Sequence, residues 1–544
     1  MYRIGRRLFV FFLSLYILTA AGYLASGDEE TMYRVSRNLA WGQTLSISQE
    51  YLVLPPLSTA GFVPTRPFFL ETTSITPGRF DSLYSRSFLG QSLLSLPLFN
   101  VGIILDNLWP TWPQLGSRLA VSMLNPILLA GTAWLLFHFI VSLGYSPRLA
   151  VIISLAFGLT TMAWPYINTF YPQPATGFCL LLTAFVFQQW YVSREARWGW
   201  WLGLGLGMAA LIRSTVLIVL PPLALLMFLN SRDWTERFRV AWRAGIPLVI
   251  SIGLSLFYNW LRFDSPFDSG YYEVAWTTPL LLGLYGLLFS SGKGIFLYTP
   301  LLLLALGALP LFFKQHRSLA WLITLWWLAY LAFYAPYNFW TGGFNWGPRF
   351  LLPLVAVSLL PCATLLHDPK TRLVLPLFIV LAGLGLLIQF PAVVSDHARY
   401  LVEQEQTGDE KFYDRTIFIP TYSPIVQQPR MMLAVWRNFR QPDRRAALTQ
   451  ILQGVDLPPA DSPANRDSAQ RILQTNVIRL NLPAIWWLHL PLWGVPGWLI
   501  AALVAPWGGL LLWSAWGLWP RGRLSDLGPT RNELLEITQP QRDG

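Results

Sequence analysis

The sequence predicts an all-α polytopic membrane protein. Of its 544 residues, 54% are hydrophobic and only 12% are charged, about half the charge of an ordinary soluble domain. The hydrophobic residues gather in runs of about 20, the length that crosses a bilayer as a helix. The mean hydropathy is +0.43. These features exclude a soluble enzyme, a disordered chain and a fibrous protein.

The first apolar run covers residues 8–26 and follows three arginines. It resembles a signal peptide, but with so many later runs we expect an uncleaved first anchor. The further predicted spans, which bring the total to about twelve, are 118–142, 148–165, 175–193, 199–213, 214–230, 244–262, 294–313, 318–337, 349–366, 372–393 and 495–518.

Residues 88–105 are apolar but include Gln91, Pro97 and Asn100, so we expect a helix on the membrane surface. With that helix left out of the spans, all the basic loops fall on one side, which the positive-inside rule makes the cytoplasm. These loops contain Arg3, Arg6 and Arg7; Arg194 and Arg197; Arg232, Arg237, Arg239 and Arg243; Lys314 and Arg317; Lys370 and Arg372; and Arg521 and Arg523. The net charge of +11 is therefore a topology signal and not a nucleic-acid-binding face. We expect a bacterial-type plasma membrane with both chain ends in the cytoplasm.

The opposite face receives four longer segments: 27–117, 166–174, 263–293 together with 338–348, and 395–482. The last is too long for a simple connection and predicts a small, partly helical cap. The predicted organisation is a membrane module over 1–393 with its first outer loop at 27–117, a cap over 394–482, a last span within 483–523 and a polar tail over 524–544.

Metal chemistry has little support in the sequence. Two cysteines lie inside apolar runs and the five histidines show no metal-binding spacing. Paired acids leave a divalent cation open, but no cofactor is required by any spacing.

The acidic residues gather on the predicted outer face and are nearly absent from the spans. A transporter usually places acids near the bilayer midplane, so this distribution favours chemistry at the membrane surface. The sharpest cluster is Asp28-Glu29-Glu30, directly after the first span. One of these carboxylates could act as a general base toward a hydroxyl; the plainer interpretation is an acidic flank that stops the first helix.

Several motifs in order along the chain resemble one family. They are Gly27-Asp28-Glu29-Glu30-Thr31-Met32-Tyr33, the segment from Tyr84 through Arg86 and Gln91 to Pro97, Tyr258-Asn259-Trp260-Leu261-Arg262 with Gly270-Tyr271, Ser290-Ser291-Gly292-Lys293-Gly294, and Trp340 through Asn345 to Arg349. This set resembles the GT-C glycosyltransferases, in particular bacterial relatives of the protein O-mannosyltransferases and the lipid A aminoarabinose transferase (glycosyltransferase family 39-like).

The resemblance implies a GT-C-like bundle, a polyprenyl-phosphate-linked sugar donor, an acceptor on the outer side and an inverting transfer. It makes Asp28 the candidate base and Glu29 its neighbour, and adds Tyr33, Tyr84, Gln91 and Asn259 to the substrate-binding candidates. In the aminoarabinose transferase type a tyrosine follows Asp-Glu at a spacing that Glu29-Glu30 fits better here, so both registers stay open. Where the family often has a second acid, this chain has Gln173.

The donor phosphate needs a cation and its prenyl chain an apolar groove. The candidate cations are Arg79, Arg86, Arg213, Lys293 and Arg349. Arg213 lies between two apolar runs, where it either meets a lipid phosphate or snorkels to the interface; Arg349 is equally compatible with an interfacial anchor.

Aromatic and amide side chains at Tyr271, Trp340 and Asn345 are candidates to contact the sugar. The predicted function is a membrane glycosyltransferase; the alternatives are a transporter or flippase of a lipid-linked saccharide, and a structural subunit of an envelope assembly.

Overall fold

The computed structural model describes residues 2–47, 74–108, 114–368, 374–405, 407–453 and 474–518. The predicted basic residues Lys370, Arg372, Arg521 and Arg523, and the tail over 524–544, lie outside these ranges.

The described chain is almost entirely helical, with one two-stranded sheet. The N-terminal half contains α1 (Tyr2–Thr19), α2 (Gly27–Ala40), β1 (Ile75–Pro77), η1 (Arg79–Asp81), β2 (Leu83–Ser85), α3 (Leu89–Leu108), α4 (Leu115–Ser122), α5 (Leu124–Ser142), α6 (Pro147–Thr160), η2 (Trp164–Asn168), α7 (Gln173–Ser193), α8 (Trp198–Ile212), η3 (Ser214–Val219), α9 (Leu220–Asn230) and α10 (Trp234–Phe263). The strands pair antiparallel with Ile75 opposite Ser85.

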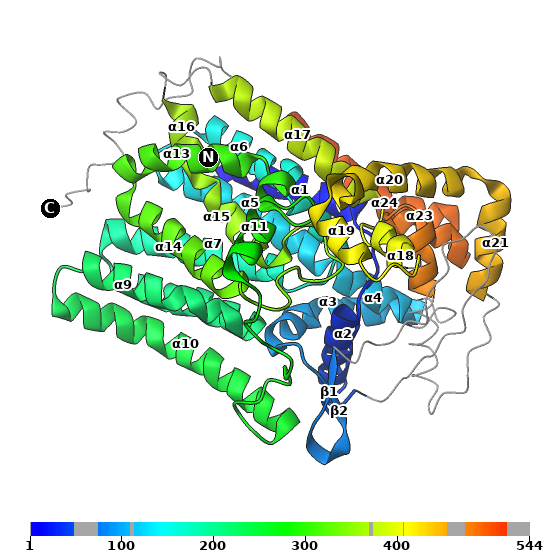
Figure 1. Ribbon diagram of the computed structural model, residues 1–544, viewed down its shortest axis with the longest axis horizontal. Helices are drawn as coiled ribbons and strands as arrows, with labels where there is room; N and C mark the ends of the chain where they lie inside the picture. Colours follow the sequence, from blue (N-terminus) through cyan, green and yellow to red (C-terminus); the bar gives the residue numbers. More distant parts are fainter. Residues whose placement is uncertain are drawn as a thin grey trace.

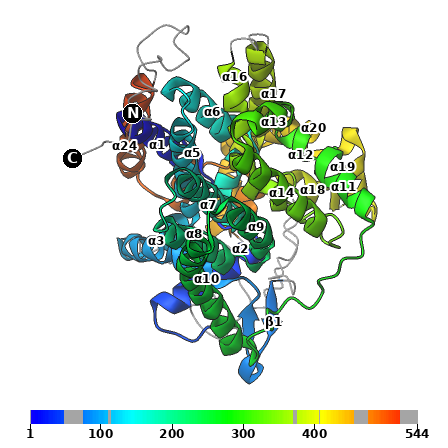
Figure 2. The same cartoon turned by 90° about the vertical axis from the view of Figure 1, so that its left-hand side faces the viewer.

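The C-terminal half contains α11 (Leu280–Phe289), α12 (Ile295–Tyr298), α13 (Leu301–Gln315), α14 (Arg317–Tyr334), η4 (Arg349–Leu351), α15 (Leu352–Ser358), α16 (Leu360–His367), α17 (Val374–Val394), α18 (Arg399–Glu405), α19 (Phe412–Phe418), η6 (Pro420–Tyr422), α20 (Pro424–Arg440), α21 (Pro442–Gln453), α23 (Trp486–His489), η7 (Leu490–Trp493) and α24 (Gly497–Trp516). Figure 1 shows the cap helices α18 to α21 gathered on one side of the bundle. In Figure 2 the hairpin lies at the edge opposite α16 and α17.

The prediction of an all-α polytopic membrane protein is confirmed. Seven described helical segments are long and apolar enough to cross a membrane, and five shorter apolar helices accompany them. Helix α3 is one of the seven, so its helical nature is confirmed whereas its position on the membrane surface stays a prediction. The count of about twelve spans also stays a prediction.

Two segments differ from the sequence-based expectation. Helix α10 begins ten residues before the predicted span because the Asp233 side chain accepts the N–H of Glu236 at 2.6 Å and caps a polar first stretch. The segment 263–293, expected as an outer loop, contains the apolar helix α11, whose ten residues are too few to cross a bilayer.

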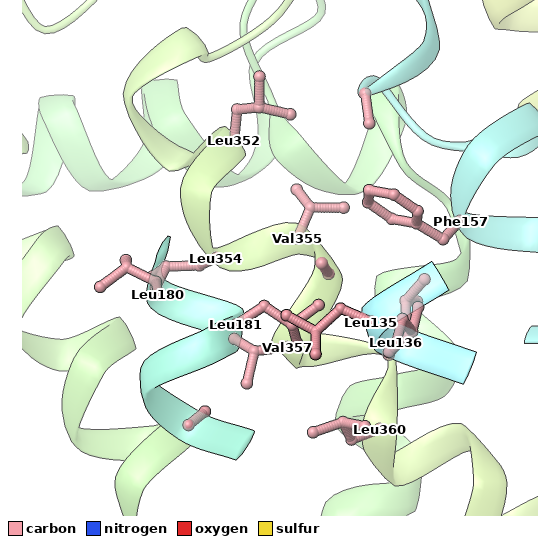
Figure 3. Packing of buried hydrophobic residues seen from close by; sticks show 14 of the residues in the cluster. Leu135, Leu136, Phe157, Leu180, Leu181, Leu352, Leu354, Val355, Val357 and Leu360 are labelled. Carbon is pink, nitrogen blue, oxygen red and sulfur yellow. The ribbon is translucent and has the colours of Figure 1, made fainter. Parts of the chain in front are cut away.

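The core lies where α5, α6, α7, α15 and α16 meet. Figure 3 shows Leu135 and Leu136 of α5 packed with Leu181 of α7 and Val357 of α15. Helices α8 and α10 lie close together because three glycines of α8 face α10: Gly199, Gly203 and Gly207. A Cβ at Gly203 would lie 2.0 Å from the Ala244 carbonyl oxygen. Such small-residue contacts replace the hydrophobic effect as the source of helix association in lipid.

Loops that the sequence places on one side of the membrane meet in the structure. Arg194 Nη1 donates to the Asn230 carbonyl oxygen at 2.5 Å, and Ser318 Oγ donates to Asn230 Oδ1 at 2.9 Å. Arg7 Nη1 donates to the Gly517 carbonyl oxygen at 2.9 Å. The start of α1 and the end of α24 therefore lie side by side.

Candidate active site

A cavity of about 1350 Å³ lies beyond the far end of α1. Segments that are hundreds of residues apart form its wall. The first loop contributes Asp28, Glu29, Ser74 and Arg86; the second outer segment contributes Asn168, Tyr171 and Gln173; later segments contribute Arg213, Thr215, Tyr271, Trp276, Tyr334, Asn345 and Arg349; and the cap contributes Asp396, His397, Tyr413 and Arg479. Seven of the fourteen predicted site residues thus line one cavity: Asp28, Glu29, Arg86, Arg213, Tyr271, Asn345 and Arg349.

Of the adjacent acids Asp28, Glu29 and Glu30, Asp28 is the one that keeps an exposed side chain in the cavity wall. It lies in the first turn of α2, which the Ser26 hydroxyl caps by accepting the N–H of Glu29 at 3.4 Å. Its Oδ1 accepts a hydrogen bond from Ser74 Oγ at 2.9 Å, and its Oδ2 lies 3.8 Å from Arg349 Nη1. The side chain keeps 39% of its surface exposed, so a substrate hydroxyl has access to it.

Glu29 points into the protein instead. It is fully buried, and its two oxygens accept the backbone N–H groups of Ala25 at 2.6 Å and Phe170 at 3.0 Å. Burial raises the pKa of Glu29 to about 7 despite these hydrogen bonds. Glu29 therefore fastens the start of the first loop to the second outer segment.

Glu30 forms two buried ion pairs. Its Oε1 lies 2.8 Å from Arg34 Nε, and its Oε2 pairs with Arg118. Burial alone would raise the pKa of Glu30, but the charges of Arg118 and Arg34 lower it to about 2. Glu30, bound in this way, does not line the cavity. The predicted ligand Tyr33 lies on the same inner side, where its hydroxyl is 2.8 Å from Ser117 Oγ.

Two arginines converge on one aromatic ring in the cavity wall. Cζ of Arg213 lies 4.9 Å, and Cζ of Arg349 5.0 Å, from the ring centroid of Phe350. Tyr334 stacks on the same ring with centroids 4.7 Å apart. Arg213 Nε donates to Thr215 Oγ1 at 3.0 Å, and no described carboxylate lies within ion-pairing distance of Arg213.

The third cation of the wall, Arg86, follows strand β2. Its Nε donates to Thr76 Oγ1 at 2.5 Å, and among the described residues it has no acidic partner. Buried Arg262 holds this segment by donating to the carbonyl oxygens of Ser85 and, at 3.3 Å, of Ser87. The predicted ligand Asn259 accepts from Arg262 Nη2 at 2.8 Å, so it supports the segment and does not reach the cavity.

The remaining predicted cations lie elsewhere. Lys293 Nζ donates to the carbonyl oxygens of Gly343 and Asn345, both at 2.8 Å, and burial lowers its pKa to about 7. It holds the glycine-rich loop that carries Asn345. Arg79 pairs with Asp264 at 2.8 Å and covers the Trp260 ring.

Three further predicted ligands have structural contacts. Tyr84 donates to the Arg79 carbonyl oxygen at 3.2 Å. Gln91 is buried and donates to the Phe170 carbonyl oxygen at 3.1 Å. The Trp340 ring fills the space beside Gly286, where a Cβ would lie 2.1 Å from it.

The cap contributes to the site through residues that the sequence does not single out. Arg479 Nε lies 3.2 Å from Asp396 Oδ2, which also accepts from the Tyr23 hydroxyl at 3.2 Å. Arg479 donates to the Ala25 carbonyl oxygen as well. This cluster ties the cap to the segment that precedes Asp28. In the sequence, Asp396 and Arg479 are two opposite charges near the two ends of the predicted cap. They are more than eighty residues apart, so they form no motif that would predict their contact.

No three His, Cys, Asp or Glu side chains of the described residues gather in a way that could hold a metal ion. A divalent cation, left open by the sequence, has no described set of ligands.

No family model matches the chain, and no curated protein matches its sequence. The structure is similar to that of ArnT from Cupriavidus metallidurans bound to undecaprenyl phosphate, with 14% identity, a TM-score of 0.43, and coverage of 88% of this chain and 76% of that chain. It is also similar to the archaeal oligosaccharyltransferase AglB from Archaeoglobus fulgidus in complex with an inhibitory peptide and a dolichol-phosphate, with 13% identity and a TM-score of 0.44. The match covers 88% of this chain but only 63% of AglB. The likeness is distant and concerns the general arrangement of helices.

Proposed function

We propose that the protein is a membrane glycosyltransferase that moves a sugar from a polyprenyl-phosphate carrier to an acceptor outside the cytoplasm. The observation that carries the proposal is the juxtaposition of an accessible carboxylate with arginines in one large cavity. Asp28 lies 3.8 Å from Arg349, and Arg213 approaches the same Phe350 ring as Arg349.

Each group has a defined task in the proposed transfer. Asp28 takes the proton of the acceptor hydroxyl as its oxygen attacks the anomeric carbon from the face opposite the phosphate, which inverts that carbon. The bond between the anomeric carbon and the phosphate oxygen breaks, and its electron pair leaves with the phosphate. Arg349, Arg213 and Arg86 stabilise the negative charge that develops on the phosphate.

The cavity wall also suits the lipid part of such a donor. Val274 and Trp276 line the cavity and are 37% and 50% exposed, so the wall continues to the outer surface of the bundle. The Trp276 ring packs edge-on against Phe333 at 5.4 Å between centroids. An apolar edge of this kind gives a prenyl chain a path from the bilayer to the arginines.

The residues that join the basic loops, such as Arg7, Arg194 and Asn230, do not line the cavity. From the positive-inside rule we propose that these loops and both chain ends face the cytoplasm, and that the site opens on the outer face of a bacterial-type plasma membrane. Membrane lipid surrounds the bundle, and the acceptor is an extracytoplasmic hydroxyl.

The experiment that tests the function measures whether the bond between the sugar and the lipid phosphate is broken. Membranes that contain the protein receive undecaprenyl phosphate carrying a labelled sugar. We expect the label to leave the lipid and undecaprenyl phosphate to accumulate, while membranes without the protein leave the donor intact. If the labelled lipid moves between leaflets with its sugar–phosphate bond unbroken, the protein is a flippase and not a transferase.

A further inference from the structure

Five side chains of the cavity wall keep buried polar atoms without a hydrogen-bond partner among the described residues: Gln173, Asn345, Arg349, His397 and Arg479. Arg479 Nε still lies 3.2 Å from Asp396 Oδ2, and His397 belongs to the cap. The other three lie on α7 and on the segment that leads into α15. Gln173 is 1% exposed and both its Oε1 and its Nε2 are unpartnered. Asn345, 5% exposed, leaves its Oδ1 unpartnered, and Arg349, 9% exposed, leaves its Nε unpartnered. All three line the same cavity.

An unpartnered buried polar atom costs a protein about 1–3 kcal/mol, so such an atom in the wall of a cavity favours a ligand that supplies the missing partner. An amide offers one acceptor and two donors, and a sugar hydroxyl both donates and accepts. The unpartnered set here combines donors at Gln173 and Arg349 with acceptors at Gln173 and Asn345. It therefore matches hydroxyl groups better than it matches a purely anionic ligand.

The packing of α7 on α15 brings these groups to one level of the bundle. A Cβ at Gly177 of α7 would lie 3.3 Å from Cα of Pro353 in α15. Gln173 and Arg349 each precede this contact by four residues, at the beginning of α7 and of the segment leading into α15. Tyr171 connects them further, because Cζ of Arg349 lies 5.1 Å from its ring centroid.

Asn345 is held beside Arg349 by its loop. The Asn345 Nδ2 donates to the Gly342 carbonyl oxygen, and Lys293 Nζ donates to the backbone carbonyl oxygen of Asn345 at 2.8 Å. Gly342 has φ +72, and a Cβ there would lie 2.8 Å from Cγ of Arg349. A glycine is therefore needed for the loop to lie against the arginine.

The carboxylates of the cavity wall lie on other segments than these two amides. Asp28 faces Arg349, and both oxygens of Glu29 accept backbone N–H groups. The other acids of the wall, Glu273, Asp396 and Glu405, belong to the loop after Tyr271 and to the cap. No described carboxylate is thus left on α7 or on the Asn345 loop to neutralise an ammonium group.

We infer that Gln173 and Asn345 form the sugar subsite of this cavity and select an uncharged, hydroxyl-rich sugar over an amino sugar. The inference rests on the proposed function and adds to it the class of sugar. Gln173 is the specificity-determining residue, because its neutral amide lines the same cavity as Arg349, the arginine proposed to hold the phosphate.

The test compares the binding of three probes to the purified protein: undecaprenyl phosphate alone, undecaprenyl phosphate bearing a neutral hexose, and the same lipid bearing an amino-hexose. We expect the wild-type protein to bind the hexose lipid about tenfold more tightly than the amino-hexose lipid. Gln173→Leu should weaken hexose-lipid binding about tenfold, the loss of about one well-placed hydrogen bond, and leave binding of the bare lipid phosphate unchanged.

Gln173→Glu keeps the shape of the side chain and adds a negative charge. It should therefore reduce or reverse the tenfold difference in affinity between the hexose lipid and the amino-hexose lipid. Gln189→Leu, at the other end of α7 and outside the cavity wall, is the matched control and should change none of the three affinities. The subsite would be overturned if Gln173→Leu bound the hexose lipid as tightly as the wild-type protein does. It would also be overturned if the wild-type protein bound the amino-hexose lipid more tightly than the hexose lipid. Sugar-selective binding without cleavage of the sugar–phosphate bond would instead overturn the proposed transfer and leave the subsite standing.

Discussion

Replacing Glu29 by glutamine should change how the stability of the protein depends on pH. The Glu29 carboxylate is fully buried, and burial raises its pKa from an ordinary 4.5 to about 7. A carboxyl with a raised folded-state pKa contributes stability that is fully present below pH 4.5 and is lost as pH rises through about 7. The shift corresponds to about 3 kcal/mol. Glutamine cannot titrate, so the unfolding free energy of Glu29→Gln relative to wild type should rise by up to this amount between pH 4.5 and pH 8.

The assay is unfolding of the detergent-solubilised protein by a denaturing detergent at pH 5, 6, 7 and 8, for wild type and variant side by side. Glu30→Gln is the matched control. The folded pKa of Glu30 is about 2, so Glu30 contributes stability above pH 4.5 that is lost only as pH falls through about 2, and wild type and Glu30→Gln should differ by a constant amount from pH 5 to pH 8. A difference between wild type and Glu29→Gln that also stays constant from pH 5 to pH 8 would refute the burial of a titrating carboxyl at this position.

Three other perturbations test the phosphate site, the bundle and the topology. Arg213→Gln should weaken binding of undecaprenyl phosphate by about tenfold or more, since a charged hydrogen bond contributes about 1.5–3 kcal/mol, whereas Arg79→Gln should leave it within about twofold; equal losses would contradict the site. Gly203→Val should lower the yield and thermal stability of the folded protein, because its side chain would overlap a backbone oxygen of α10; normal stability would contradict the packing of α8 on α10. A cysteine at Asp264 should react with an impermeant thiol reagent added to intact cells and one at Arg237 should not; the reverse pattern would overturn the orientation.

Much of the fold could be predicted because lipid imposes a simple rule on sequence. A run such as 175–193 must satisfy its backbone hydrogen bonds within itself, so its apolar length alone defines a helix, and α7 covers Gln173–Ser193. Helix α11 was missed because ten apolar residues satisfy neither the rule for a span nor the pattern of a polar loop. Fine boundaries depend on caps, as the early start of α10 at Asp233 shows.

The site could be predicted only in part, because the sequence gives the charge of a side chain but not the direction in which that side chain points. Asp28, Glu29 and Glu30 are adjacent in sequence, yet one faces the cavity, one binds backbone N–H groups and one forms ion pairs with arginines. Successive residues of a helix point about 100° apart, so the partners of each depend on the packing of α2. Lys293 looked like a phosphate ligand from its neighbours in the chain, but its ammonium group meets carbonyl oxygens.

The contribution of the cap could not be predicted at all. Arg479 lies 454 residues from Ala25 in the sequence, and only the folded chain brings its guanidinium to the Ala25 carbonyl oxygen. No pattern in one sequence reports a contact of that range.

In the proposed transfer, Asp28 removes the proton of the acceptor hydroxyl. The most direct measurement is the rate of sugar transfer by Asp28→Asn at saturating donor, together with its affinity for the donor. Asparagine keeps the shape of the side chain but cannot take up a proton, and general-base catalysis contributes about 10²–10⁴-fold. We predict a loss of at least about a hundredfold in rate with donor affinity within about threefold of wild type, and no loss in the exposed control Asp443→Asn on α21. Transfer by Asp28→Asn at a near-normal rate would contradict the account.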